Sequence, residues 1–283
     1  MQMKKIDRRS HLTAEVFQRE YLQQNKPVIL TDAMQTWPAL QKWNLSFFKQ
    51  QYGHLEVPVF SNNYSKPGKG YMAHDCMMSF GEFLDVISSG PSDLRLFLFD
   101  LFGPAPELRE DFRFHTHLMG GWITKLPFMF FGAPGSEVTL HYDIDCANVF
   151  LSQFCGTKRV ILFAPGESEK IYHHPFTVKS LIDPKKPDLL KFPALKHVQG
   201  YDDTLQHGET LFMPSRFWHY MRYEDFSFSM ALRSQNSLFT AFRGGVNLAT
   251  HYVVDKGLNS LMGEKWHEWK ERQAYARARV YEG

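Results

Sequence analysis

The chain has 283 residues, of which 43% are hydrophobic, 22% charged and 15% aromatic, so we expect a folded protein with a thick aromatic core or a deep apolar pocket. A formal net charge of +2 indicates no strong preference for nucleic acid or membranes, and no apolar run approaches the ~20 residues of a membrane span. The three cysteines lack zinc spacing and the N-terminus lacks an apolar signal-peptide segment, so we expect reduced thiols in a cytoplasmic protein.

The first 125 residues mix helical and strand patterns, separated by the turn WPALQKW and the loop SKPGKG. Apolar spacing near 3.6 residues predicts helices, and alternation predicts strands. The predicted helices are 12–24, 45–52 and 78–88, and the predicted strands are 25–30 and 54–61. Ser79 is placed to cap the helix at 78–88, and the stretch 103–120 is rich in loop residues. We interpret residues 1–125 as an N-terminal α/β flank.

From about residue 126 the sequence consists of short β-branched or aromatic runs separated by Gly, Pro and Asp. This pattern predicts an antiparallel sandwich or barrel over residues 126–236 rather than alternating β and α units. Helical spacing returns after about residue 245, so 237–283 is a predicted C-terminal helical segment. Because we find no internal repeat or clear linker, we expect a single domain over 1–283.

The stretch LHYDIDCANVF at 140–150 places His141 and Asp143 two residues apart between apolar runs. On a strand, residues i and i+2 face the same side. A buried carboxylate has to be paired, protonated or bound to metal. Asp145 shares this parity and is an alternative ligand, although it lies closer to the loop. A buried, hydrogen-bonded His–Asp pair without metal is the alternative interpretation.

A third ligand is predicted in HGETLFMPSRFWHY, where Gly208 opens a strand, Pro214 ends it and His219 opens the next strand. Two histidines and one carboxylate on one side of a metal, with the other positions open, suit non-haem Fe(II) oxygen chemistry. A closed four-ligand structural zinc site would leave no position for a co-substrate.

The segment HYD…GTKRVILFAPG…GETLFMPSRFWH resembles the JmjC/cupin-8 group of Fe(II)- and 2-oxoglutarate-dependent oxygenases. Within that group the chain is most similar to the factor-inhibiting-HIF-like branch, and the resemblance extends from about residue 12 to 236. It implies a mainly β fold with helical flanks, built on a double-stranded β-helix (jelly-roll) barrel. It also implies that His141, Asp143 and His219 hold the iron.

The resemblance further implies that 2-oxoglutarate chelates the iron and that a cation deep in the barrel holds its far carboxylate. Lys158 fits that role, because its strand otherwise presents Val160, Leu162 and Ala164 on the same face; a solvated strand end is the alternative. Thr139 is the candidate for an assisting hydroxyl, or else a plain strand residue. Two further co-substrate contacts are expected less directly from the match, at Asn148 and at Arg233, and Arg233 could instead lie at a strand end.

The predicted function is hydroxylation of a side chain in a protein or peptide substrate. The alternatives are the same cofactor chemistry on tRNA or a small metabolite, and a non-catalytic metal-binding cupin module. Nucleic acid is not favoured by the near-neutral charge, and no membrane partner is expected. The related barrels often pair through the helices that follow them, so we expect a homodimer through residues 254–280, with apolar positions Leu258, Leu261, Trp266, Trp269 and Tyr275.

Two other histidine pairs are not expected to bind metal. His115 and His117 lack a third ligand in a turn–strand context, and His173 and His174 are adjacent, so they point apart on an extended chain and are expected at the surface or in a loop. The stretch from Trp266 to Arg272 is predicted to be one face of an interaction helix.

Overall fold

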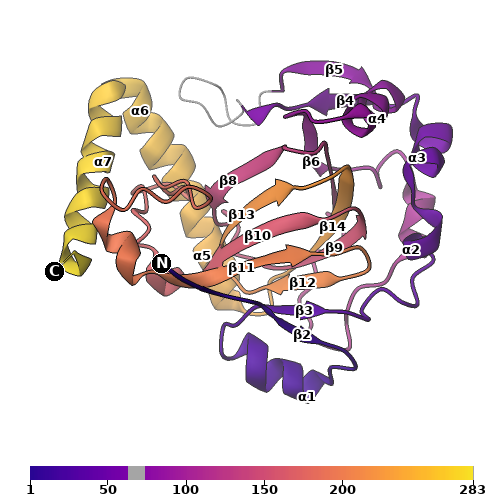
Figure 1. Cartoon of the computed structure of the whole chain (residues 1–283), viewed down its shortest axis with the longest axis horizontal. Coiled ribbons are helices and arrows are strands. Elements are labelled where there is room, and N and C mark those ends of the chain that lie inside the picture. Colours follow the sequence, from indigo (N-terminus) through magenta and orange to yellow (C-terminus); the bar gives the residue numbers. More distant parts are fainter. Residues whose placement is uncertain (63–73, 283) are drawn as a thin grey trace.

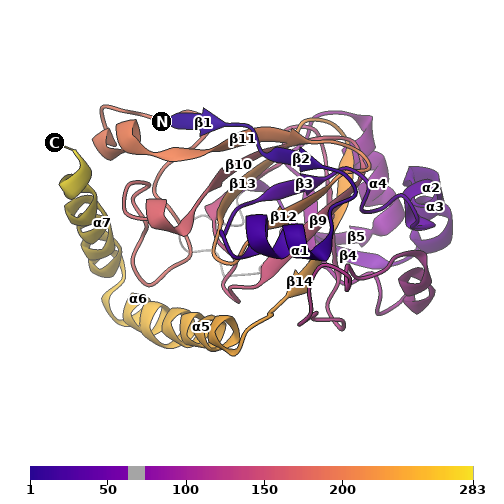
Figure 2. The ribbon, with the colours of Figure 1, turned by 90° about the horizontal axis from the view of Figure 1, so that it is seen from below.

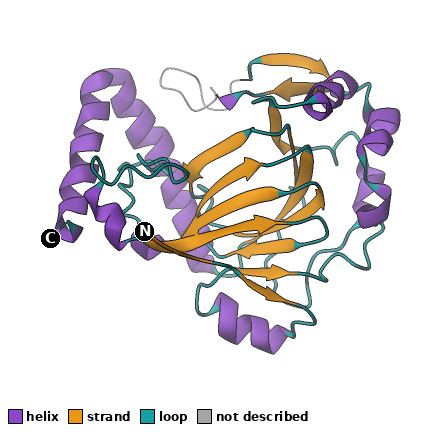
Figure 3. Cartoon of the chain, in the orientation of Figure 1, coloured by secondary structure: helices purple, strands orange, loops and turns teal. Residues whose placement is uncertain are grey.

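The computed structural model describes residues 1–62 and 74–282, and it places two large β-sheets between helical flanks (Figure 1, Figure 3). The SKPGKG segment, predicted as a loop, lies outside the described residues. Within the described ranges, no helix is both long enough and apolar enough to cross a membrane.

The strands of the described chain form a five-stranded sheet, a seven-stranded sheet and a separate hairpin, and all pairs except β1–β11 and β2–β3 are antiparallel. The five-stranded sheet has the order β1 (Gln2–Lys4), β11 (Gln199–Leu205), β10 (Lys158–Phe163), β13 (Trp218–Tyr223), β8 (Glu137–His141). The seven-stranded sheet has the order β2 (Asp7–Arg9), β3 (Val28–Leu30), β12 (Thr210–Met213), β9 (Asn148–Cys155), β14 (Ser227–Ser234), β7 (Phe128–Gly132), β6 (Arg95–Phe99). The hairpin is β4 (Glu56–Val59) with β5 (Cys76–Ser79).

The two large sheets pack face to face, and their central strands β9, β10, β12, β13 and β14 are buried on both sides. In β10, Val160 and Leu162 belong to the core between the sheets, whereas Ile161 and Phe163 belong to a second core on the outer face. Side chains alternate across a strand, so one strand can serve both cores. The predicted jelly-roll class is confirmed, and the described strands do not close into a barrel. Among the described strands none of one sheet pairs with a strand of the other, and the fold is an open sandwich.

The N-terminal flank covers the outer face of the seven-stranded sheet with an aromatic core. Its helices are α1 (Ala14–Phe17) continued by a π-helical turn η1 (Gln18–Leu22), α2 (Ala39–Lys42), α3 (Leu45–Tyr52), α4 (Phe80–Ser89) and the 3-10 helix η3 (Pro106–Asp111). Phe17, Phe48 and Phe80 from these helices pack with Phe150 and Phe228 from the sheet. The flank also contributes β1, β2, β3 and β6, so its strands extend both large sheets.

Two predictions for this flank are settled by its helix caps. The Ser79 cap is confirmed. The side chain of Ser79 accepts a hydrogen bond from the backbone N–H of Glu82, and the carboxylate of Glu82 accepts one from the backbone N–H of Ser79. The WPALQKW segment was predicted as a turn, but it contains the short helix α2. Pro38 stands at the N-cap of this helix, where its missing N–H costs no hydrogen bond.

The C-terminal helices lie at the opposite end of the sheets from α2, α3 and α4 (Figure 1, Figure 2). They are α5 (Leu238–Ala249), the π-helical η6 (Thr250–Asp255), α6 (Lys256–Met262), α7 (Glu264–Ala278) and the 3-10 helix η7 (Arg279–Tyr281). Ala274 and Ala278 of α7 pack on the outer face of the five-stranded sheet, together with the segment 165–198. That segment connects β10 to β11 and contains the 3-10 helices η4 (Pro165–Glu167) and η5 (Pro193–His197).

Candidate metal centre

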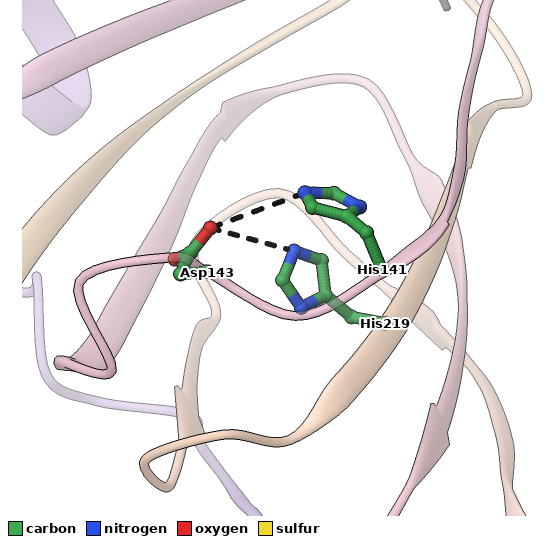
Figure 4. A group of neighbouring side chains, drawn as sticks. All are labelled: His141, Asp143 and His219. Atoms are coloured by element: carbon green, nitrogen blue, oxygen red, sulfur yellow. Dashed lines mark ion pairs between the residues drawn. The ribbon is translucent and has the colours of Figure 1, made fainter. Parts of the chain in front are cut away.

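Three side chains from two neighbouring strands and one turn converge at one end of the sheets (Figure 4). His141 ends β8, and its register partner on β13 is His219, so their ring centroids lie 4.3 Å apart. Asp143 follows two residues after the strand, and its Oδ1 lies 3.9 Å from the Nε2 atom of each histidine. One donor atom from each of the three residues lies within 4.8 Å of the others.

The position of Asp143 has a different cause from the one predicted. β8 ends at His141, so the alternation of side chains along a strand does not place Asp143. A turn does so, in which the backbone N–H of Cys146 donates to the carbonyl of Asp143 at 3.0 Å. Helix α5 packs on this turn at Gly244, where a Cβ atom would lie 2.3 Å from the carbonyl oxygen of Asp145.

Both histidines are oriented by backbone carbonyls. Nδ1 of His141 lies 2.8 Å from the carbonyl oxygen of Thr139, and Nδ1 of His219 lies 3.1 Å from that of Phe217. A carbonyl only accepts, so Nδ1 carries the proton and Nε2 keeps its lone pair for a metal. Burial, with the neighbouring His219, lowers the pKa of His141 to about 3, which keeps the imidazole neutral at neutral pH.

Arg233 on β14 bridges two carboxylates of the turn. One guanidinium nitrogen lies 3.5 Å from Oδ2 of Asp143 and the other 3.5 Å from Oδ2 of Asp145. Burial by itself would raise the pKa of Asp143, but Arg233 and the two histidines lower it below the usual value. Asp143 therefore carries its negative charge at neutral pH. Burial and the charge of Asp143 raise the pKa of Asp145, although Arg233 opposes that shift.

A cavity of about 200 Å³ lies between the two sheets, and the three converging side chains stand in its wall. Lys158, which begins β10, also lines it and is 1% exposed. Its ammonium donates to Oγ of Ser229 at 2.5 Å and lies 4.2 Å from the ring centre of Tyr223. Within the described part of the chain no carboxylate is paired with Lys158. Burial lowers the pKa of Lys158 to about 7.

A glycine turn positions Lys158. Gly156 has φ +65, and a Cβ atom there would lie 2.1 Å from Oδ1 of Asp225. The same Asp225 accepts from the backbone N–H and the hydroxyl of Thr157, at 2.7 and 3.0 Å. The next residue along the strand, Arg159, points away from the cavity and pairs with Asp202 at 2.7 Å.

The other predicted co-substrate residues have different surroundings. Thr139 lines the cavity, and so does Arg233, whose guanidinium faces the two aspartates. Asn148 stands outside the cavity wall: its Oδ1 accepts from the backbone N–H of Ser215 and its Nδ2 donates to Asn236. The hydroxyl in contact with Lys158 belongs to Ser229 and not to Thr139.

The sequence interpretation missed three residues in or next to the cavity, Ser229, Tyr223 and Lys179. Arg233 is on the inner face of β14, and Ser229 has the same parity, so strand alternation was a usable signal for Ser229. Tyr223 is the register partner of Lys158, and register is not visible in one sequence. Lys179 lines the cavity from the segment 165–198, which carries no periodic pattern that would have predicted it.

The histidines outside the site have structural surroundings. His115 is 2% exposed and stacks on Trp37 with ring centres 5.1 Å apart. His174 was expected at the surface or in a loop; it lies in a loop but is buried, next to His267 of α7. Burial lowers the pKa of both His115 and His174 to about 3, so both are neutral packing groups at neutral pH.

Comparison with known proteins identifies the family. The chain matches the family model described as "Cupin-like domain" over residues 13–243. It is 29% identical to the lysine-specific demethylase JMJ30 of Arabidopsis thaliana over 81% of this chain and 54% of that protein. It is 24% identical to the human tRNA wybutosine-synthesizing protein 5, over 78% of this chain and 75% of that protein.

A further relative is the human bifunctional peptidase and (3S)-lysyl hydroxylase JMJD7, which is 23% identical over 73% of this chain and 76% of that protein. The chain spans about half the length of several relatives that it matches, among them two lysine-specific demethylases and a Jumonji C domain-containing protein. The family model covers most of the chain, including both histidines and the aspartate of the convergent group. The chain therefore belongs to the family of proteins with a Cupin-like domain.

Proposed function

We propose that this protein is an Fe(II)- and 2-oxoglutarate-dependent oxygenase. The observation that carries the proposal is Lys158, a buried cation without a carboxylate partner among the described residues, in the same cavity as the His–Asp–His group. A buried charge without a counter-charge is costly, so its retention indicates an anionic ligand. A β-sandwich that only binds metal has no need of such a cation. The JmjC group that the chain resembles depends on the same two cofactors.

The donor set fits the proposed metal. Two imidazole nitrogens and one carboxylate oxygen converge in the wall of the cavity. This arrangement suits Fe(II) with open positions for other ligands. When bound, Fe(II) with 2-oxoglutarate supplies the oxidation: O2 converts 2-oxoglutarate to succinate and CO2, and its second oxygen atom enters a substrate C–H bond. We assign His141, Asp143 and His219 as the metal ligands.

The residues of the chain have separate tasks in this proposal. Lys158 binds the far carboxylate of 2-oxoglutarate, and Ser229 fixes the ammonium in position. Tyr223 packs beneath that ammonium and excludes water from the contact. Met213, Met221 and Leu151 form part of the apolar wall, which keeps competing solvent away from the reacting groups. The carbonyls that hold the two Nδ1 protons keep the imidazoles in the orientation that a metal requires.

We propose a side chain of a protein or peptide as the substrate. The names of several relatives support this, since one is called a lysyl hydroxylase and others lysine-specific demethylases. Another relative is named for tRNA wybutosine synthesis, which keeps tRNA as the second candidate substrate. A small metabolite and a non-catalytic binding module are further alternatives. Membership of the factor-inhibiting-HIF-like branch stays a prediction.

A single assay separates these functions. The purified protein is incubated with Fe(II), ascorbate, 2-oxoglutarate and O2, and succinate is measured with and without panels of peptides and tRNA. An oxygenase of the proposed kind forms succinate, and a substrate stimulates it and gains the mass of one oxygen atom. A binding module holds metal and forms no succinate. Stimulation by tRNA and not by peptides would overturn the protein-substrate part of the proposal.

We also propose that the protein is a cytoplasmic homodimer that pairs through its C-terminal helices. Three of the residues expected at that interface pack within the chain instead. Trp266 and Trp269 stack on each other and on Phe176, and Tyr275 packs on Tyr172 of the same chain. Apart from Val280 in η7, the exposed large apolar positions of the described C-terminal helices lie in α5, η6 and α6: Leu238, Phe239, Phe242, Val246, Leu248, Val253, Leu261 and Met262.

The apolar face of α5 supports this proposal. Leu238 is 92% exposed and Phe242 is 68% exposed, and their spacing of four residues places them on one face with Val246. Contiguous exposed apolar surface of this kind marks an interaction site. A second copy presents the same face, so a twofold interface would bury both.

A further inference from the structure

Lys179 lies beside the metal centre by strand pairing. The segment Val178–Ser180 pairs with the outer edge of β8: the backbone N–H of Tyr142 donates to the carbonyl of Val178 at 3.1 Å, and that of Ser180 donates to Leu140 at 3.3 Å. This pairing is antiparallel and sets Lys179 opposite His141. Opposed residues of an antiparallel pair face the same side. The side chain of Lys179 accordingly lines the cavity next to His141.

The ammonium of Lys179 has no direct counter-charge. Among the described residues no carboxylate lies within ion-pair distance of it. The carboxylate that acts on Lys179 electrostatically is that of Asp255. Its Oδ1 already accepts hydrogen bonds from Lys270 at 2.6 Å and from the indole of Trp266 at 3.0 Å. Burial lowers the pKa of Lys179, and Asp255 only partly opposes that shift. A half-buried cation is thus held at the cavity wall at a cost in stability.

The charges of the described cavity wall do not balance without an added anion. Its cations are Arg95, Lys158, Lys179 and Arg233, and its carboxylates are Asp143 and Asp145. Arg233 faces both carboxylates, and Arg95 donates to the carbonyl of Glu137 and to Asn62. Under the proposed function Lys158 takes the far carboxylate of 2-oxoglutarate. Within the described wall this leaves Lys179 as the cation to which no bonded acceptor has been assigned.

We propose that Lys179 selects an acidic substrate: the peptide segment that enters this cavity carries an Asp or Glu carboxylate, which pairs with Lys179 beside the residue that is oxidised. This inference rests on the proposed function, because it assigns Lys158 to 2-oxoglutarate. A carboxylate fits better than a phosphate, since one lysine matches one negative charge, whereas phosphate groups are usually held by arginine forks or several donors.

The test uses three synthetic peptide libraries of equal length, with Asp/Glu, Asn/Gln or Lys/Arg at one central position and the same mixture elsewhere. The protein is loaded with Mn(II) and 2-oxoglutarate and immobilised, and the bound peptides are sequenced. We expect the acidic library to be retained at least about tenfold better than the amide library, as for one charge-assisted hydrogen bond. Lys179→Met should abolish this preference, and Lys179→Glu should turn it toward the basic library.

Two variants control for indirect effects. Lys196→Met removes an exposed lysine from the same segment 165–198 and should leave the acidic preference intact. Lys179→Arg keeps the charge and should keep the preference, so it tests the idea even where the methionine variant fails to fold. No acidic preference in the parent protein, or a preference that survives in a folded Lys179→Met, would overturn the inference.

The inference and the proposed function fail in different ways. Succinate formation from 2-oxoglutarate with Fe(II) and O2, measured without any peptide, tests the oxygenase alone. If succinate forms and the acidic preference is absent, the assignment of Lys179 is wrong and the oxygenase stands. If no succinate forms, the proposed function itself is wrong.

Discussion

Asp143 presents one carboxylate oxygen to the two histidines and the other to Arg233. Its Oδ1 lies 3.9 Å from each imidazole Nε2, while its Oδ2 lies 3.5 Å from a guanidinium nitrogen of Arg233. The guanidinium is paired with Oδ2, and Oδ1 is the carboxylate oxygen that faces the two imidazoles. This relationship also separates Asp143 from Asp145, whose carboxylate faces Arg233 and the backbone N–H of Ala147.

The first prediction concerns the proposed metal ligands. His141→Ala, Asp143→Ala and His219→Ala should each abolish 2-oxoglutarate turnover and reduce Mn(II) binding, measured by the free Mn(II) signal in electron paramagnetic resonance. Each variant removes one of three donors, so the remaining two bind weakly. The melting temperature should change little, because these side chains stand in the cavity wall. Asp145→Asn is the matched control and should keep both metal binding and turnover. If Asp145→Asn lost the metal and Asp143→Ala kept it, Asp145 rather than Asp143 would be the ligand.

The second prediction concerns the co-substrate cation. Lys158→Met keeps the volume of the stem and deletes the charge, and it should raise the 2-oxoglutarate requirement by about two to three orders of magnitude. That factor corresponds to a charge-assisted contact of roughly 3–4 kcal/mol. Isothermal titration of the Mn(II)-loaded protein with 2-oxoglutarate measures the change. Arg159→Met is the neighbouring control, and it should have little effect because Arg159 points away and pairs with Asp202. Equal losses in the two variants would contradict the assignment.

The third prediction concerns stability and pH. Burial lowers the pKa of Lys158 to about 7, below the usual lysine value of 10.5 that applies in the unfolded chain. The cost of burying this cation is therefore fully present below pH 7, and it disappears as pH rises toward 10.5. Without added metal or 2-oxoglutarate, Lys158→Met should be more stable than the parent by about 2–4 kcal/mol at pH 7. Urea unfolding at pH 7 and pH 10 should show this difference shrinking with pH. A difference that stays constant would show that repacking causes it.

The fourth prediction concerns assembly. Light scattering at micromolar concentration should give twice the 33.0 kDa of one chain. Phe242→Glu places a charge on the exposed apolar face of α5 and should give single chains, because a buried unpaired carboxylate is costly at an interface. Leu190→Glu is the control: Leu190 is 94% exposed and lies in the segment 165–198, away from α5. A mass of 33.0 kDa for the unaltered chain would refute the dimer.

Much of the fold was readable from strand patterns. The apolar runs after residue 126 predicted the sandwich, because strands buried on both faces carry few polar residues. The face shared by Lys158, Val160 and Leu162 was also correctly predicted, since alternation along a strand is a local property. Alternation could not show whether the sheets close into a barrel, because closure depends on which strands pair across the whole fold. In the structure the two large sheets stay separate and open at their edges.

The sequence by itself determined which chemical groups are available: two histidines, an aspartate and a lysine at positions that strand period and turn residues make recognisable. Only the tertiary structure decided their partners. The hydroxyl that Lys158 contacts belongs to Ser229 and not to Thr139. Asn148 accepts a hydrogen bond from the backbone N–H of Ser215, and Lys179 pairs with His141 across a β-bridge. The physical reason is that hydrogen bonds and ion pairs form over a few ångströms between residues far apart in the chain. Those distances follow from strand register and loop docking, which no local pattern of one sequence records.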